Sequence, residues 1–235
     1  MIGPGIGIAA VGAAGMLAWA VRGRSATLLA DSVWRGPAHR RALALTFDDG
    51  PSESTPQLLQ LLARTGAHAT FFQCGHHVRR LPEITRAITA AGHELGNHTD
   101  THPPLYLRSS AFIHDELARA QESLVSASGQ PPRWFRAPYG VRWFGLGSAQ
   151  RVLDLTGVMW STIALDWKLP APVIVRRLQR ATAPGAILCL HDGRELAHQP
   201  DIRETLAAVE QLLPWWANEG YELLTLSELL CPTTN

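Results

Sequence analysis

The sequence predicts an α/β fold in which about seven strand–helix units form a barrel or an incomplete barrel. The main observation is that short apolar runs alternate with helical patterns along most of the 235 residues, which is the sequence form of βα units. No Gly-rich dinucleotide-binding loop follows the first predicted strand, which counts against the alternative, a doubly wound open sheet. The length suits one large domain, or a domain with an anchor.

The strands and helices are placed by apolar runs and by the spacing of apolar residues. Strands are predicted at 42–47, 67–72, 93–96, 134–135, 158–165, 186–190 and 221–224. Helices are predicted at 55–64, 81–91, 110–126, 172–182 and 201–217, with an apolar segment at 226–230 closing the chain. In a barrel of this kind the functional residues gather at the carboxyl ends of the strands.

The N-terminal segment, residues 2–21, carries no charge and is long enough to span a bilayer as a helix. It is rich in Gly and Ala, and Arg22 and Arg24 follow it at once. We expect a hydrophobic signal-anchor helix. The alternatives are a cleavable signal peptide with Ala18-Trp19-Ala20 as its small-x-small site, and a poorly ordered tail. The predicted division is an anchor or signal segment at 1–24, a linker at 25–40 and a catalytic domain at 41–235.

The expected location is therefore at a membrane, or outside the cell after export, and the sequence leaves the side open. Five arginines follow the uncharged segment within the next twenty positions: Arg22, Arg24, Arg35, Arg40 and Arg41. By the positive-inside tendency these arginines would keep the domain in the cytoplasm, which is unexpected for an exported enzyme.

Charge and cysteine content exclude several function classes. The 21 Lys and Arg residues nearly balance the 20 Asp and Glu residues, so no nucleic-acid footprint is indicated. The three cysteines, Cys74, Cys189 and Cys231, have no metal-knuckle spacing and imply no disulfide framework. Cys189 lies in an apolar run and is predicted to be buried.

Adjacent carboxylates end the first predicted strand. The apolar run from Ala42 leads to Asp48 and Asp49, and Gly50-Pro51 follows. Neighbouring residues of a strand point to opposite faces, so both carboxylates can reach one site only if the backbone turns there. Paired acids at the mouth of a buried strand are costly unless they hold a metal or perform acid–base chemistry. A plain surface turn is the alternative for this stretch alone.

Other strand ends also deliver polar groups. His98 and His102 stand four apart, a spacing that on a helical turn would place both rings on one face. Arg136 follows the fourth predicted strand and could hold a carboxylate, and Asp166 and His191 close two later strands. Each feature alone is more often structural than catalytic. Together they gather at one end of the barrel, and two histidines with one carboxylate form a ligand set that leaves positions open for water and substrate.

These motifs, in this order, resemble the polysaccharide deacetylase family, the chitin-deacetylase-like carbohydrate esterases of family 4. The matching segments are Thr46-Phe47-Asp48-Asp49-Gly50-Pro51, His98-Thr99-Asp100-Thr101-His102, Arg136-Ala137-Pro138-Tyr139-Gly140, Asp166-Trp167 and Leu190-His191-Asp192. The resemblance runs from about Arg41 to Leu230. It implies a distorted, incomplete (β/α) barrel and a metal-dependent amidase that removes N-acetyl groups from N-acetylglucosamine residues of a cell-wall or chitin-like glycan.

The resemblance also implies a role for each site residue. Asp49, His98 and His102 would hold a divalent metal, usually Zn²⁺. Asp48 would be the general base, and Arg136 would orient it and favour its charged form. His191, held protonated by Asp166, would be the general acid for the departing amine, and the backbone N–H of Tyr139 would stabilise the oxyanion.

One position departs from the family pattern, which often has a further Asp three residues before Asp166, where this chain has Ile163. The retained Asp166 is the one that the mechanism uses. Trp143, Phe144 and Trp167 could stack on sugar faces or pack in the core. His76 and His77 could line the cleft, although a plain surface loop is the more common arrangement.

Two alternative functions are compatible with the sequence. A deacetylase or deformylase of a lipid-linked amino sugar would suit the hydrophobic N-terminus. A non-catalytic glycan-binding protein could use the same fold, but the intact base, ligand set and acid count against it.

Overall fold

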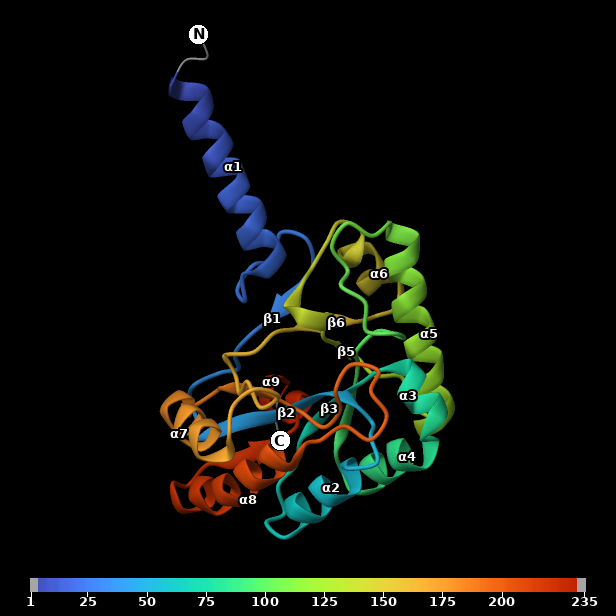
Figure 1. Ribbon diagram of the computed structural model, residues 1–235, viewed down its shortest axis with the longest axis vertical. Helices are drawn as coiled ribbons and strands as arrows, with labels where there is room; N and C mark the ends of the chain where they lie inside the picture. The colour runs from blue at the N-terminus through green and yellow to red at the C-terminus, as the bar shows by residue number, and fades with distance from the viewer. Residues whose placement is uncertain (1–3, 232–235) are drawn as a thin grey trace.

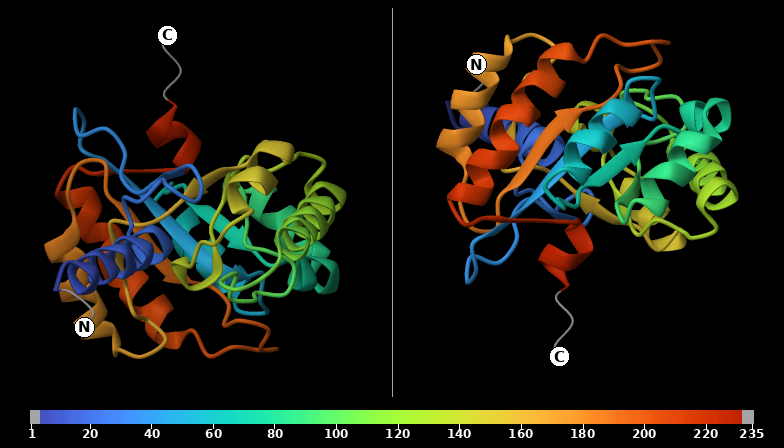
Figure 2. Two further views of the ribbon diagram at one scale, coloured as in Figure 1. Left: turned by 90° about the horizontal axis from the view of Figure 1, so that it is seen from above. Right: turned by 90° about the horizontal axis from the view of Figure 1, so that it is seen from below.

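The computed structural model describes residues 4–231, with side chains from residue 12 onward (Figure 1). Its strands are β1 (Ser32–Val33), β2 (Ala42–Gly50), β3 (Thr70–Gln73), β4 (Glu94–Asn97), β5 (Trp134–Phe135), β6 (Thr156–Val158), β7 (Thr162–Ile163), β8 (Ile187–His191) and β9 (Glu222–Leu224). Its helices are α1 (Pro4–Arg22), α2 (Thr55–Ala63), α3 (Gly75–Arg80), α4 (Pro82–Ala90), α5 (Ser110–Ser128), the 3₁₀ turn η1 (Pro138–Gly140), α6 (Leu146–Val152), α7 (Ala171–Ala181), α8 (Arg203–Asn218) and α9 (Leu226–Leu230). Figure 2 shows the strands grouped centrally with helices around them.

The strands form one curled sheet in which every pair is parallel. From β2 to β6 each strand pairs with the next along the chain, while β8 and then β7 extend the other edge of β2. β1 adds to the free edge of β6, and β9 pairs with the start of β2. This order is consistent with the predicted distorted (β/α) barrel.

The single strand predicted at 158–165 is wrong, because the chain forms two short strands there. β6 pairs with β5, whereas β7 pairs with β8, and only residues 159–161 lie between them. Such a short connection places β6 and β7 nearly end to end, since three residues cannot form a crossover. One broken extended segment therefore connects β6, the neighbour of the edge strand β1, to β7 at the opposite edge of the curled sheet.

The core explains why β2 reads as an apolar run in the sequence. All nine residues of β2 are buried, as expected for a parallel strand covered on both faces. Phe47 on β2 stacks on Phe71 of β3 with 5.2 Å between ring centroids. Trp216 of α8 is completely buried in the same cluster. The packing holds β2 rigid, so the residues at its carboxyl end are fixed by the sheet.

The N-terminal segment is helical and projects from the rest of the molecule as α1 (Figure 1). Among residues 4–231, however, none of the helices is long and apolar enough to cross a membrane. The prediction of a transmembrane helix is therefore not supported. The predicted segment also includes residues 1–3, which lie outside the described residues.

Residues predicted as a linker at 25–40 take part in the fold. β1 lies within this range and pairs with β6. Ala26 and Ala30 are buried, and the guanidinium of the buried Arg142 donates to the carbonyl of Ala26 over 2.6 Å. The backbone N–H of Arg142 also donates to the carbonyl of Val21. The chain between α1 and β2 is thus tied to the loop after β5.

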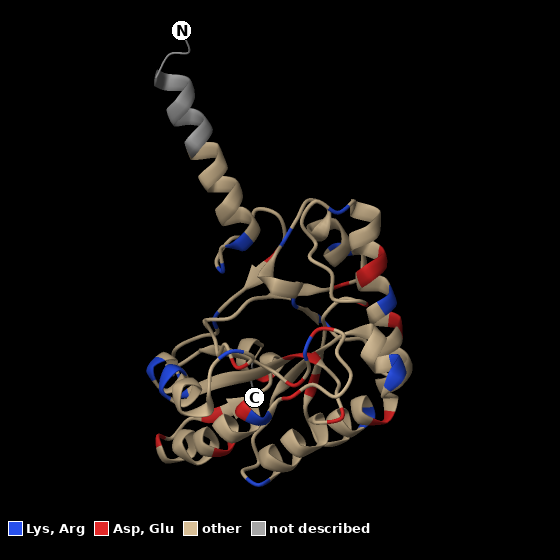
Figure 3. Ribbon diagram, viewed as in Figure 1, with Lys and Arg blue, Asp and Glu red and all other residues tan. Residues whose placement is uncertain are grey.

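Charged residues of both signs are spread over the outer helices in the described part of the chain (Figure 3). On α5, for example, Arg119 stands among the acidic residues Asp115, Glu116 and Glu122. The helices α3 and α6 were not predicted. α3 is six residues long and α6 seven, too short for a clear helical period.

Candidate active site

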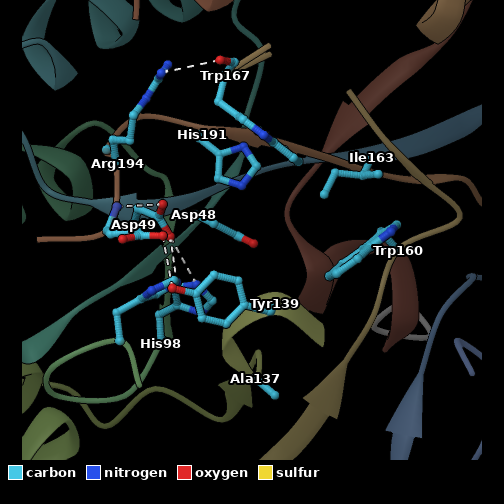
Figure 4. A pocket seen from close by; sticks show the side chains of 13 residues that line it. Asp48, Asp49, His98, Ala137, Tyr139, Trp160, Ile163, Trp167, His191 and Arg194 are labelled. Carbon is cyan, nitrogen blue, oxygen red and sulfur yellow. Dashed lines mark hydrogen bonds and ion pairs between the residues drawn. The ribbon is translucent and has the colours of Figure 1, made fainter. Parts of the chain in front are cut away.

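A cleft of about 530 Å³ opens at the carboxyl ends of the strands. Of the predicted site residues, six line this cleft: Asp48, Asp49, His98, His102, Tyr139 and His191. The other two, Arg136 and Asp166, are buried and contact cleft residues from behind. Figure 4 shows Asp48, Asp49 and His191 directed at the same space, with Tyr139 on one side and Trp160 and Ile163 across it. The structure therefore brings all eight predicted residues together.

The two adjacent aspartates converge because the backbone turns at the end of β2. The register between β2 and β3 shifts between Phe47 and Gly50, and Asp49 has a φ of 72°. This left-handed conformation is unfavourable for a non-glycine residue. It rotates Asp49 away from the alternation of a regular strand, so that both carboxylates reach the cleft. Asp48 stays in register with His191 of β8.

Three side chains form a set that could bind a metal ion. Asp49 Oδ1 lies 3.2 Å from His98 Nε2 and 3.1 Å from His102 Nε2. All three residues are buried, and one ligand atom from each lies within 4.8 Å of the other two. Burial opposes ionisation of Asp49, but the contacts with His102 and His98 outweigh it and hold the pKa of this carboxyl well below its usual range. An anionic oxygen and two imidazole nitrogens are donors that Zn²⁺ accepts.

The tautomer of His98 fits a ligand role. Its Nδ1 lies 2.7 Å from the carbonyl oxygen of Arg136. A carbonyl can only accept, so Nδ1 carries a hydrogen, and in the neutral ring Nε2 keeps the lone pair that could bind a metal. This is the arrangement in which a second contact orients a metal-binding histidine.

The segment that carries both histidines is a loop and not the helical turn that the spacing suggested. Thr99 and His102 have positive φ values of 67° and 55°. Glu116 of α5 holds this loop, since its Oε2 accepts from the backbone N–H groups of Asp100 and Thr101 at 3.1 and 2.8 Å. Two hydrogen bonds to one buried carboxylate compensate for the irregular backbone, so the rings converge without helical geometry.

Asp48 is held by a buried guanidinium. Arg136 is completely buried and its Nη1 lies 2.6 Å from Asp48 Oδ1 and 2.7 Å from Thr46 Oγ1. The guanidinium also stacks over Phe72, 4.2 Å from the ring centroid. The opposite oxygen, Asp48 Oδ2, faces the thiol of Cys189 at 3.4 Å. The carboxylate is thus fixed on both sides without closing its access to the cleft.

His191 is paired with Asp166 through two hydrogen bonds. Its Nδ1 lies 2.8 Å from Asp166 Oδ1, and its backbone N–H donates to Oδ2 over 2.8 Å. Thr205 of α8 donates to the same Oδ2. Burial opposes the charged ring, but Asp166 and the nearby Asp49 and Asp48 outweigh burial and raise the pKa of His191 to about 9. A protonated imidazole therefore faces the cleft at neutral pH.

Comparison with known proteins agrees with this geometry. The family described as "Polysaccharide deacetylase" matches residues 35–156. A chitooligosaccharide deacetylase from Bradyrhizobium sp. (strain ANU 289) is 37% identical over 198 residues, which cover 80% of this chain and 90% of the relative. The chain belongs to the polysaccharide deacetylase family.

Other members of the family include active and inactive proteins. A peptidoglycan-N-acetylglucosamine deacetylase from Bacillus cereus is 33% identical over 201 residues, 84% of this chain and 92% of the relative. A family 4 carbohydrate esterase from Streptomyces lividans, solved with acetate, has a TM-score of 0.72 at 32% identity and covers 80% of this chain and 93% of its own. A pseudoenzyme of the same family from Bacillus anthracis has a TM-score of 0.77 at 27% identity. The match covers 84% of this chain and 68% of the pseudoenzyme.

Sequence reasoning missed several residues of this polysaccharide deacetylase cleft. Trp160 lines it from the break between β6 and β7, and Glu195 lines it from the loop after β8. Neither belongs to a motif, and no periodic signal marks them. Of the three aromatic residues that could stack on sugar faces, Trp167 lines the cleft, whereas Trp143 and Phe144 are not among its lining residues.

Asp192 of the last motif and His77, which the sequence offered as a cleft residue, both have structural contacts. The buried Asp192 accepts a hydrogen bond from Thr55 over 2.6 Å, and burial raises its pKa to about 7. His77 is buried in α3, contrary to the surface loop expected for it, and its ring contacts the carbonyl oxygen of Glu195.

Proposed function

We propose that this chain is a metal-dependent hydrolase that removes N-acetyl groups from N-acetylglucosamine residues of a cell-wall or chitin-like glycan. The observation that carries the proposal is the convergence in one cleft of a metal-ligand set, a carboxylate and a protonated imidazole. Amide hydrolysis needs an activated water and a protonated leaving amine, and this site has a group for each task. The relatives named above act, by their names, on chitooligosaccharide or on peptidoglycan N-acetylglucosamine.

Asp49, His98 and His102 would hold the metal, for which Zn²⁺ suits the donor set best. When bound, such an ion supplies a Lewis acid that polarises the acetamide carbonyl and makes water more acidic. Asp48 takes the proton from the attacking water, and the contact with Arg136 keeps its carboxylate oriented for this transfer. The backbone N–H of Tyr139 stabilises the developing oxyanion.

His191 carries out the second proton transfer. Its Nε2–H gives a proton to the departing sugar amine, which is a poor leaving group until it is protonated. Asp166 binds Nδ1, so the ring presents Nε2 to the cleft. After the reaction, Asp48 releases the proton that it took from water and His191 regains one, so both groups return to their starting states. Each step assigns one proton to one named atom.

A binding protein without activity is the second candidate, because a pseudoenzyme shares this fold. The presence of the base, the ligand set and the acid in one cleft favours the enzyme. Membrane attachment or export of the chain stays a prediction.

The test is acetate release from N-acetylglucosamine oligomers by the purified protein. Chelation should abolish the release, and Zn²⁺ or Co²⁺ should restore it. Full turnover in a rigorously metal-free preparation would overturn the metal-dependent mechanism. Binding of the oligomers without any acetate release in the metal-loaded protein would support the binding protein.

A further inference from the structure

Glu195 is an exposed residue of the loop after β8, and its backbone and side chain both contact the site. Its backbone N–H donates to Asp49 Oδ2 over 2.9 Å. Its carbonyl accepts from His77 Nε2 over 2.8 Å, and its carboxylate Oε1 accepts from the hydroxyl of Tyr139 over 2.9 Å. The three partners belong to the end of β2, to α3 and to η1. Glu195 therefore connects three elements that the sheet does not join.

The backbone of this loop is held against the end of β2. The N–H groups of Asp192 and Gly193 both donate to the carbonyl of Asp48, at 3.1 and 3.3 Å. A side chain at Gly193 would collide with the carbonyl of Asp49, so only glycine allows this approach. Glu195 has a φ of 48°, a conformation that side chains rarely adopt and that its contacts must maintain.

The contact with Glu195 determines which oxygen Asp49 can offer to a metal. Oδ1 faces both histidines, while Oδ2 is occupied by the Glu195 N–H. A carboxylate with one oxygen bound in this way cannot rotate freely and presents the other oxygen in a fixed direction. Hydrogen bonds to metal ligands commonly change metal affinity by 10- to 100-fold when they are removed.

Tyr139 links this contact to the second histidine. Its ring packs edge-on against His102 with 4.8 Å between ring centroids, and its hydroxyl reaches Glu195. A carboxylate oxygen can only accept, so the hydroxyl is the donor in this contact. The side chain thus has a contact that is separate from the proposed role of its backbone N–H.

We propose that Glu195 is a positioning residue for the metal ligand Asp49, and that the Tyr139 hydroxyl tethers it. The inference rests on the metal-dependent function proposed above. It assigns to Glu195 no contact with the substrate. Its effect passes through the backbone N–H, which reaches Asp49 Oδ2 only while the loop keeps its conformation.

The experiment measures the Zn²⁺ affinity of metal-free protein by competition with a chromophoric chelator. Tyr139→Phe removes the hydroxyl and keeps the ring and the backbone, and Glu195→Ala removes the acceptor. Each should weaken Zn²⁺ binding about tenfold, and the double variant should be no weaker than the weaker single variant. Glu195→Gln keeps an oxygen acceptor and should bind Zn²⁺ within about threefold of the wild type.

A matched control is Glu53→Ala, since Glu53 accepts from the backbone N–H of Gln199 near the far end of the same loop. It should leave the Zn²⁺ affinity unchanged. The inference is overturned if the Tyr139 and Glu195 variants bind Zn²⁺ like the wild type, if their losses multiply, if Glu195→Gln is as weak as Glu195→Ala, or if Glu53→Ala weakens binding equally.

The two proposals fail in different ways. A wild-type protein that releases acetate, with variants of unchanged Zn²⁺ affinity, overturns the role of Glu195 alone. A wild type that binds Zn²⁺ without releasing acetate, and whose affinity falls in the variants, overturns the proposed function and supports the role of Glu195.

Discussion

The charge on His191 depends chiefly on Asp166, and the variant Asp166→Asn tests this dependence. Asparagine can still accept a hydrogen bond from the ring, but it carries no charge. The pKa of His191 should therefore fall from about 9 toward the ordinary 6.5. Such a change corresponds to about 3 kcal/mol of preference for the protonated ring, at about 1.4 kcal/mol for each pKa unit.

The effect on activity should depend strongly on pH. At pH 8 the protonated fraction of His191 would fall from about 0.9 to about 0.03, so kcat/KM should drop about 30-fold. At pH 6 most of the rings stay protonated in both proteins, and the drop should be less than about twofold. The assay is acetate release from a soluble N-acetylglucosamine oligomer between pH 5 and 10.

A control separates charge from position. Thr205 donates to Asp166 Oδ2, and Thr205→Val removes this donor while the carboxylate keeps its charge. The pH profile of kcat/KM for Thr205→Val should stay close to that of the wild type. The reasoning is refuted if the alkaline limb of Asp166→Asn lies at the same pH as that of the wild type, or if its loss is equal at pH 6 and pH 8.

The pH dependence of folding stability is a second measurement of the His191 pKa, and the direction of the change is fixed. The pKa of His191 is higher in the folded protein than the ordinary value of the unfolded chain, so protonation favours folding. The contribution is fully present below about pH 6.5 and is lost as the pH rises through about 9. Thermal unfolding of the wild type should show this loss, and Asp166→Asn should not.

Two further predictions concern the roles of Asp48 and Asp49 and the contribution of the N-terminal segment to stability. Asp48→Asn should retain the metal after dialysis but lose roughly 10²-fold or more in turnover, whereas Asp49→Asn should lose the metal as well. The reverse result would exchange the roles of base and ligand. A chain beginning at residue 19 should stay folded, while one beginning at residue 36 lacks β1 and the backbone acceptors of Arg142. Its free energy of unfolding should fall by at least about 2 kcal/mol, measured in urea, and equal stability of the two chains would contradict this.

The clustering of the motif residues could be predicted because each motif lies at the carboxyl end of a strand or shortly after it. Asp48 and Asp49 end β2, and His191 ends β8. Parallel strands bring their carboxyl ends to one edge, so an order of motifs along the chain becomes a cluster in space. The turn expected between the two aspartates is present at Asp49.

The local geometry was less predictable from the residues. The spacing of His98 and His102 suggested a helical turn, yet they lie on a loop that Glu116 holds from α5. Glu195 acts through its backbone, and a backbone N–H leaves no signature in the sequence. Long helices such as α5 and α8 were placed correctly because their apolar spacing persists over several turns, which α3 and α6 do not allow.

The break between β6 and β7 was also hidden, and it is part of the site. A regular strand over 156–163 would direct its carbonyl groups to a neighbouring strand. At the break, the carbonyls of Val158 and Met159 accept from the guanidinium of Arg136 instead, each at 3.3 Å. These contacts satisfy donors of the buried cation that Asp48 and Thr46 do not reach. An unbroken strand would leave those donors unpaired, at a cost of about 1–3 kcal/mol each. The irregular strand therefore helps to determine where the guanidinium lies, and through it the orientation of the Asp48 carboxylate.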